Sequence, residues 1–90
     1  MFIVVCYDVS DDKRRRKLHQ KLKNFGEPVQ YSVFECLLND GQFQRLKQII
    51  AHLVDPQEDK VRYYNLCHAC QKLIEVINGE VTREEALILV

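Results

Sequence analysis

A run of basic residues follows the first apolar segment of the chain. Seven of the 13 lysines and arginines lie between positions 13 and 23, and no acidic residue stands among them. These seven are Lys13, Arg14, Arg15, Arg16, Lys17, Lys21 and Lys23. On a helix they would cover every side that is not buried, and such a positive surface attracts phosphate groups. A solvated helix face is the other interpretation, and the run alone does not decide between them.

Asp8 precedes this basic run, near the end of the apolar segment 2–9. Ligand sites in open α/β folds favour the carboxyl ends of strands, where a carboxylate can hold Mg²⁺ together with waters and phosphate oxygens. A turn or cap residue is the more common role of a lone aspartate, and one carboxylate is a poor metal site by itself. In a two-fold dimer the residue occurs twice, so two Asp8 side chains can share one ion.

The segment Cys67-His68-Ala69-Cys70 has the CxxC spacing of zinc and redox sites. A structural zinc site needs four ligands, and Cys6 and Cys36 fall in expected strands rather than in a second knuckle. A thioredoxin-type motif follows a first strand, whereas this segment follows a late one. We therefore interpret these residues as turn residues and buried thiols.

Hydrophobic patterning predicts alternating strands and helices. Residues 2–9 form a continuous apolar run, typical of a central strand covered on both faces. A helix is expected over 11–25, because Ser10 can cap its start and Gly26 can end it. Its buried stripe is formed by Leu18, Leu22 and Phe25.

The rest of the chain continues this alternation. Residues 28–38 are β-prone and form either one long strand or two short ones divided by a kink near Tyr31 and Ser32. A second helix then starts at a cap, Asn39 or Asp40. Further strands are expected over 60–66 and 72–77.

This order of elements predicts the α+β class: a ferredoxin-like βαββαβ sandwich with an extra C-terminal strand. Residues 1–78 form the domain, and residues 79–90 form a tail that is expected to contact a partner or the second chain of a dimer. Two helices cover one face of the sheet, whereas the strand residues look apolar on both faces. A homodimer packed through the sheets would cover the second face.

The composition sets limits on these expectations. The chain has 90 residues, the size of one domain, and its 13 basic and 13 acidic residues cancel. A net charge of zero argues against a nucleic-acid binder, but the acids gather elsewhere, and phosphate meets the local field. Four of the acids are Glu75, Glu80, Glu84 and Glu85. No apolar run has the length of a membrane-spanning helix, and the start lacks the basic region of a signal peptide, so we expect a cytoplasmic protein without membrane contact.

Two ordered motifs resemble those of the CRISPR-associated protein 2 family. The first is Val5-Cys-Tyr-Asp-Val-Ser-Asp-Asp-Lys-Arg-Arg-Arg-Lys-Leu18, and the second is Gln30-Tyr-Ser-Val-Phe-Glu-Cys36. The resemblance covers residues 1–66 well and the remainder only loosely. Some members have an arginine shortly before the second motif, where this chain has Pro28 and Val29.

The resemblance implies a ferredoxin-like homodimer in which the last strand of each chain joins the partner's sheet. It also implies a metal-dependent endonuclease acting on RNA or DNA, and a scaffold that acquires new spacers with CRISPR-associated protein 1. By position, Asp8 matches the metal-binding aspartate, which implies one Mg²⁺ shared by the Asp8 side chains of both subunits. Positions linked to activity or substrate contact are matched by Tyr7, Arg14, Arg16 and Phe34.

The expected site therefore combines a catalytic pair, Asp8 and Tyr7, with a nucleic-acid-binding set. That set is Lys13, Arg14, Arg15, Arg16, Lys17 and Phe34. An ion at Asp8 would activate water for attack on a phosphodiester, and Arg14 and Arg16 would neutralise the developing charge. The alternatives are a purely structural DNA-binding adaptor and a toxin-like RNA interferase.

Overall fold

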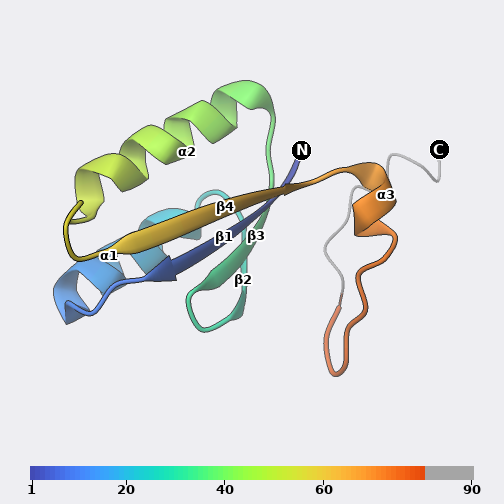
Figure 1. Cartoon of the computed structure of the whole chain (residues 1–90), viewed down its shortest axis with the longest axis horizontal. Helices are drawn as coiled ribbons and strands as arrows, with labels where there is room; N and C mark the ends of the chain where they lie inside the picture. Colours follow the sequence, from blue (N-terminus) through green and yellow to red (C-terminus); the bar gives the residue numbers. More distant parts are fainter. Residues whose placement is uncertain (81–90) are drawn as a thin grey trace.

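The computed structural model describes residues 1–80, which form one sheet, two longer helices and one short helix (Figure 1). In chain order the elements are β1 (Phe2–Asp8), α1 (Asp12–Leu22), β2 (Glu27–Gln30), β3 (Val33–Leu37), α2 (Asp40–Leu53), β4 (Lys60–Leu66) and α3 (His68–Gln71). The strands at 2–9 and 60–66 and the two longer helices are therefore confirmed, with small changes at their ends.

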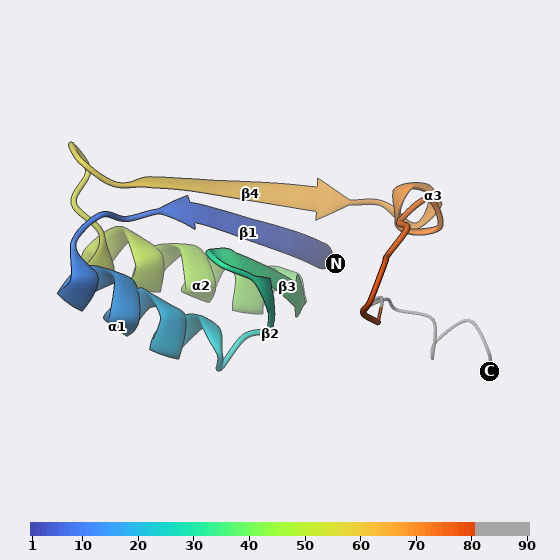
Figure 2. The ribbon, with the colours of Figure 1, turned by 90° about the horizontal axis from the view of Figure 1, so that it is seen from below.

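The sheet has four strands in the order β2-β3-β1-β4, and each neighbouring pair is antiparallel. β1 is central: it pairs with β3 and, from Phe2↔Leu66 to Asp8↔Lys60, with β4. Helices α1 and α2 both lie on one side of the sheet, and its other side is left open by them (Figure 2). This is the ferredoxin-like arrangement, so the expected fold class is confirmed.

Both longer helices begin at side-chain caps. Asp11, rather than Ser10, caps α1 by accepting a hydrogen bond from the backbone N–H of Arg14. Asn39 caps α2 in a reciprocal capping box with Gln42. Helix α1 ends at Leu22, earlier than expected, because the next residues form tighter turns such as Phe25 N–H to Leu22 O. Within residues 1–80, no helix is both long and apolar enough to cross a membrane.

The core lies between the sheet and the two helices. Alternate residues of β1 point into it, and they meet one face of β3 and the apolar stripes of the helices. The cluster consists of Ile3, Val5, Tyr7, Val9, Leu18, Leu22, Phe34, Cys36, Leu38, Leu46 and Ile50. Leu18 and Leu22 of α1 are buried in this core, so the basic residues of the helix lie on its other faces.

The β-prone segment 28–38 forms two strands, β2 and β3, with a turn at Tyr31 and Ser32. Ser32 has φ 59°, in the left-handed region that reverses the chain tightly. Its carbonyl still accepts the backbone N–H of Tyr7 at 3.0 Å, so the turn is tied to the end of β1. Of the two alternatives open from the sequence, the divided strand is correct.

The expected strand over 72–77 is wrong. After β4 the chain forms the single turn of helix α3 and then continues to residue 80 without regular structure. The side chain of Gln71 is buried, and its Nε2 donates to the carbonyl of Leu66 at 2.9 Å, which fastens this helix to the end of β4. The apolar residues Leu73 and Ile77 are exposed, so the apolar and β-branched composition of this segment was a poor guide to its structure. Most of the expected tail 79–90, from residue 81 on, lies outside the described residues.

Candidate functional site

Asp8 is the last residue of β1, where the central strand leaves the sheet. Its side chain is exposed, and no hydrogen bond or ion pair joins it to another residue within 1–80. In the β1–β4 register it stands opposite Lys60. Adjacent residues of a strand point to opposite faces, and the neighbour of Asp8, Tyr7, belongs to the core on the helix side. Asp8, with Lys60 opposite, therefore lies on the face that the helices leave open.

One chain supplies only part of a metal site. Among residues 1–80, no group of three or more histidine, cysteine, aspartate or glutamate side chains is placed to hold an ion. Asp8 alone is nevertheless a hard oxygen ligand free of internal partners, and Mg²⁺ commonly takes one or two carboxylates and keeps its waters. The donor chemistry of Asp8 therefore fits Mg²⁺, and residues 1–80 of one chain supply no group of side chains that completes the site.

Tyr7 does not share the face of Asp8. Adjacent strand residues point to opposite faces, and the Tyr7 ring is buried on the helix side. Its hydroxyl is 3.4 Å from Nδ1 of His19, and burial raises the pKa of the phenol above its ordinary value. Tyr7 therefore stays protonated at neutral pH and anchors the end of β1 beneath Asp8.

The expectation that Phe34 contacts nucleic acid is wrong. Its side chain is 0% exposed, stacked against Tyr7 with ring centroids 6.5 Å apart and in edge contact with His19. A ring without accessible surface cannot stack on a base. Phe34 is a core residue of β3, as its place in the apolar alternation of that strand already suggests.

Arg14, in the first turns of α1, is bound to the loop that precedes β4. Its Nε donates to Asp59 at 2.9 Å, and its Nη2 donates to Asp59 at 3.3 Å and to Glu58 at 3.4 Å. The Asp59 side chain has no exposed surface, and the hydrogen bond from Arg14 holds the pKa of this carboxyl below its usual range. Arg14 therefore serves a structural contact first, which the sequence did not indicate.

The other basic residues of α1 fall into two groups, those bound to other parts of the chain and those exposed without a partner within residues 1–80. Arg15 donates to the carbonyls of Val9 and Ser10 and pairs with Asp12, so its guanidinium is held in place at the start of the helix. Lys13, Arg16 and Lys17 are exposed, and none of them forms an ion pair within the described part of the chain. These three side chains, together with Lys21, which is also exposed and has no ion pair within residues 1–80, are the ones that α1 leaves free for phosphate.

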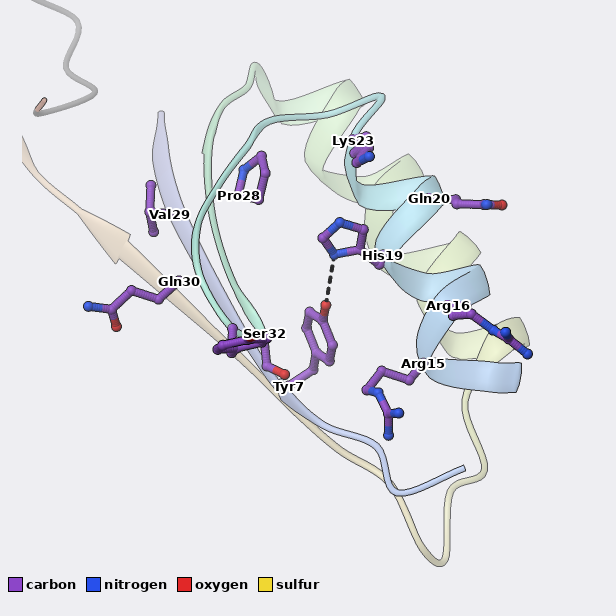
Figure 3. Close-up of a pocket in the computed structure, with 11 residues that line it drawn as sticks. Tyr7, Arg15, Arg16, His19, Gln20, Lys23, Pro28, Val29, Gln30 and Ser32 are labelled. Carbon is purple, nitrogen blue, oxygen red and sulfur yellow. Dashed lines mark hydrogen bonds between the residues drawn. The ribbon is translucent and has the colours of Figure 1, made fainter. Parts of the chain in front are cut away.

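A pocket of about 620 Å³ separates α1 from the β2–β3 turn (Figure 3). One wall is formed by α1 and the other by residues 28–32, and Tyr7 lies between them. The helix residues are Arg15, Arg16, His19, Gln20 and Lys23. The sequence analysis missed this pocket, although the spacing of four between Arg15, His19 and Lys23 places them on one helix face.

The two cysteines of the CxxC segment are exposed, which corrects their interpretation as buried thiols. Cys67 caps α3 and Cys70 lies inside it, with their sulfur atoms 3.4 Å apart. Hydrogen bonding from Cys70 lowers the pKa of Cys67, while the same contact raises the pKa of Cys70. No further ligand completes a metal group around them within residues 1–80.

The open face of the sheet is partly apolar. Val4 on β1 lies between Glu35 on β3 and Tyr64 on β4, and Tyr64 is 45% exposed. The hydroxyl of Tyr64 accepts a hydrogen bond from Nη1 of Arg62 at 3.3 Å, on the same face. This face therefore carries both apolar and charged groups, with Asp8 at one end of it, and a second chain packed on it stays a prediction.

The fold and site together define a class: small ferredoxin-like α+β proteins with a free aspartate at the end of the central strand and a basic first helix. Comparison with known proteins agrees with this class. The profile of the family described as "CRISPR associated protein Cas2" matches residues 1–74, and the chain belongs to this family.

Individual relatives extend the match over most of the chain. A protein of Moorella thermoacetica named "CRISPR-associated endoribonuclease Cas2 1" is 41% identical over 87 residues, covering 91% of each chain. The crystal structure of Streptococcus pyogenes Cas2 superposes with a TM-score of 0.77 at 30% identity, covering 87% of this chain and all of that one. A chain of a partial Cas6-RT-Cas1–Cas2 complex gives a TM-score of 0.76 at 32% identity, covering 89% of this chain and 93% of its own.

Proposed function

We propose that this protein acts in CRISPR adaptation as a dimeric endonuclease that hydrolyses phosphodiester bonds, with RNA as the first substrate to test. The names of its relatives, which call them endoribonucleases, support this activity. The observation that carries the proposal is Asp8, a free carboxylate at the end of the central strand. Helix α1, with its unpaired cations, begins only four positions further on.

The chemistry divides between two sets of side chains. The two Asp8 side chains of the dimer would together hold one Mg²⁺. When bound, this ion would polarise a phosphate oxygen and lower the pKa of a coordinated water. Lys13, Arg16 and Lys17 bind neighbouring phosphates and orient the strand, because no internal carboxylate competes for them within residues 1–80. Tyr7 acts as a positioning residue, since its buried ring and its backbone bond to Ser32 fix the strand end that presents Asp8.

The test compares the wild-type protein with Asp8→Asn on RNA, single-stranded DNA and duplex DNA, in Mg²⁺ and in EDTA. We expect cleavage by Asp8→Asn to fall by about 100-fold or more, which corresponds to several kcal/mol of transition-state stabilisation. Asp40→Asn is the matched control, because Asp40 is also an exposed aspartate but lies in the first turn of α2. Undiminished cleavage by Asp8→Asn, or equal cleavage in EDTA, would overturn the proposal.

A second candidate function is a scaffold that holds DNA for Cas1 without using the nuclease. The match to a chain of a partial Cas6-RT-Cas1–Cas2 complex favours this candidate. A scaffold should acquire spacers normally with Asp8→Asn but fail when residues 80–90 are deleted or when Lys13, Arg16 and Lys17 are replaced by glutamine. A required nuclease predicts that Asp8→Asn abolishes acquisition. Cleavage of translated messages upon expression would instead indicate a toxin-like interferase.

Both functions place the protein with nucleic acid in the cytoplasm. Fractionation of cells that express the tagged protein checks this location.

A further inference from the structure

We propose that the pocket between α1 and the β2–β3 turn binds one unpaired nucleotide of a single-stranded nucleic acid. The proposal rests on the proposed function and adds to it a site on this chain that receives one base and its phosphate. It concerns the helix side of the sheet, whereas Asp8 lies on the open face. The pocket and the Asp8 site can therefore be tested separately.

The size of the pocket suits a nucleotide. Its volume of about 620 Å³ lies in the range of small-molecule sites, which hold a ligand between apolar walls and a few placed polar groups. Pro28 and Val29 supply apolar surface on the turn side, and the close-up shows Pro28 facing the gap toward the helix (Figure 3). A base has the flat, largely apolar faces that such walls accept.

The charge of the pocket suits a phosphate. Arg15, Arg16 and Lys23 are among its lining residues, and no aspartate or glutamate of the described chain lines it. The Arg15 guanidinium is already held by the carbonyls of Val9 and Ser10, so little side-chain entropy is lost when its remaining N–H groups bind an anion. A neutral apolar ligand would make no use of these cations.

Polar groups at the centre of the pocket can hydrogen-bond the base. His19 points toward Tyr7 with Nδ1 3.4 Å from the hydroxyl, and Phe34 packs behind the imidazole. The other ring nitrogen of His19 has no hydrogen-bond partner within residues 1–80. The imidazole and the Tyr7 hydroxyl thus offer hydrogen-bonding groups at the centre of the pocket.

Tyr31 provides a stacking platform at the rim. It lines the pocket, yet its side chain is fully exposed, at 101% of the reference area. Ser32, in the left-handed conformation, holds the turn in this shape, and its carbonyl is bonded to the backbone of Tyr7. An exposed tyrosine beside fixed cations is the combination with which proteins bind unpaired bases.

These features favour a single strand. A base inside a duplex is already stacked on its neighbours, and flipping it out costs a few kcal/mol. An unpaired base can enter between α1 and the turn without that cost, while its phosphate meets Arg15 and Arg16. Duplex DNA would contact only the exposed cations on the outer faces of α1.

The experiment uses adenosine 5′-monophosphate and an oligoadenylate as probes, with the full-length ¹⁵N-labelled protein. We expect both probes to shift the amide resonances of residues 28–32 and of His19. Tyr31→Ala should weaken binding by about tenfold, the usual value of one base–aromatic stack. Tyr31→Phe should restore binding, because it keeps the ring. Since Tyr31 is fully exposed, neither variant removes a packing contact.

Two control variants distinguish binding in the pocket from nonspecific electrostatic binding and from binding at Asp8. Arg45→Gln removes an exposed cation from α2, outside the pocket, and should leave binding unchanged. Asp8→Asn should bind the monophosphate as the wild type does. Shifts confined to other residues, unchanged affinity in Tyr31→Ala, or equally tight binding when the oligoadenylate is annealed to its complement would overturn the pocket.

Failure of the pocket and failure of the nuclease have different signatures. If the wild type cleaves RNA and Tyr31→Ala cleaves it with an unchanged KM, the pocket is wrong and the nuclease stands. If Asp8→Asn still cleaves fully while the monophosphate shifts residues 28–32, the nuclease assignment is wrong and the pocket stands.

Discussion

The Nε of Arg14 donates to Oδ2 of Asp59 at 2.9 Å, across 45 positions of the sequence. The same Asp59 oxygen accepts the backbone N–H of Asp55 at 2.8 Å. One buried carboxylate therefore connects the first turns of α1 to the loop that leads into β4. Since β4 carries Lys60 opposite Asp8, this contact also bears on the strand end that forms the candidate metal site.

We expect Asp59→Asn to lower the melting temperature more than Glu58→Gln does. Both carboxylates contact Arg14, but Asp59 is buried and receives two hydrogen bonds from the arginine, whereas Glu58 is 65% exposed. Loss of charge at a buried, doubly bonded position removes more stabilisation than loss at an exposed one. Thermal unfolding followed by circular dichroism measures the difference. Equal melting temperatures of the two variants would contradict the structural role of this pair.

The same pair predicts how stability depends on pH. Arg14 lowers the pKa of Asp59, so the folded state binds this proton less readily than the unfolded state, where the pKa is about 3.9. The stabilisation is thus present above that value and is lost as the pH falls through the lower folded pKa. We expect the stability difference between wild type and Asp59→Asn to be full at pH 7 and to shrink below pH ~4. Urea denaturation at several pH values tests this, and a difference that stays constant into strong acid would contradict it.

Free and engaged cations of α1 should differ in their effect on nucleic-acid binding. We expect Lys17→Gln to reduce the slope of log affinity against log salt by about one, since one phosphate contact is lost. Arg14→Gln should leave the slope nearly unchanged but lower the melting temperature, because Arg14 is bound to Asp59. Fluorescence anisotropy over a salt series distinguishes the two. A larger change of slope in Arg14→Gln would show that the ion pair opens when nucleic acid binds.

Gly26, directly after the turn that ends α1, has no room for a side chain. A Cβ there would overlap the carbonyl oxygen of Glu35 and stand 2.5 Å from the sulfur of Cys36. We expect Gly26→Ala to destabilise the protein by about 1–3 kcal/mol, the usual cost of overpacking. Gly41→Ala is the matched control: its Cβ meets only Asn39 Oδ1 at 3.5 Å, and alanine in helix α2 should stabilise by about 0.5–1 kcal/mol. Chemical denaturation measures both, and a neutral Gly26→Ala would contradict the packing.

The fold followed from local patterns, whereas the site depended on contacts that no pattern contains. The stripe of Leu18 and Leu22 and the capping residue Asn39 are visible in the sequence because their partners are three or four positions away. The Arg14–Asp59 contact joins distant segments, so the basic run looked uniform although two of its arginines are engaged. The burial of Phe34, which excludes it from contact with nucleic acid, was also not visible in the sequence. A family motif shows that a position matters, but it does not show whether the side chain is accessible.

The segment after β4 failed for a different reason. Residues 72–77 are rich in apolar and β-branched side chains, as strands commonly are, but such a composition gives a strand only where a neighbouring strand offers backbone partners. Within residues 1–80 the chain turns at α3 instead, and Leu73 and Ile77 stay exposed. The expectation that the last strand joins the sheet of a partner chain stays a prediction.

The open face of the sheet yields the last prediction, which concerns the dimer. Tyr64 lies on this face in the edge strand β4, opposite Val4, and Glu35 lies on the other side of the central strand. If two chains pack through this face about a two-fold axis, each substitution occurs twice in the interface. Tyr64→Glu would then bury two added charges near Glu35, and burial of unpaired like charges is strongly unfavourable. We expect Tyr64→Glu to be a folded monomer in size-exclusion chromatography with light scattering, while wild type and the control Tyr31→Glu are dimers. If, as proposed, the Asp8 side chains of both subunits hold one Mg²⁺, the monomer should also lose cleavage; a monomeric wild type that cleaves RNA would refute the shared site.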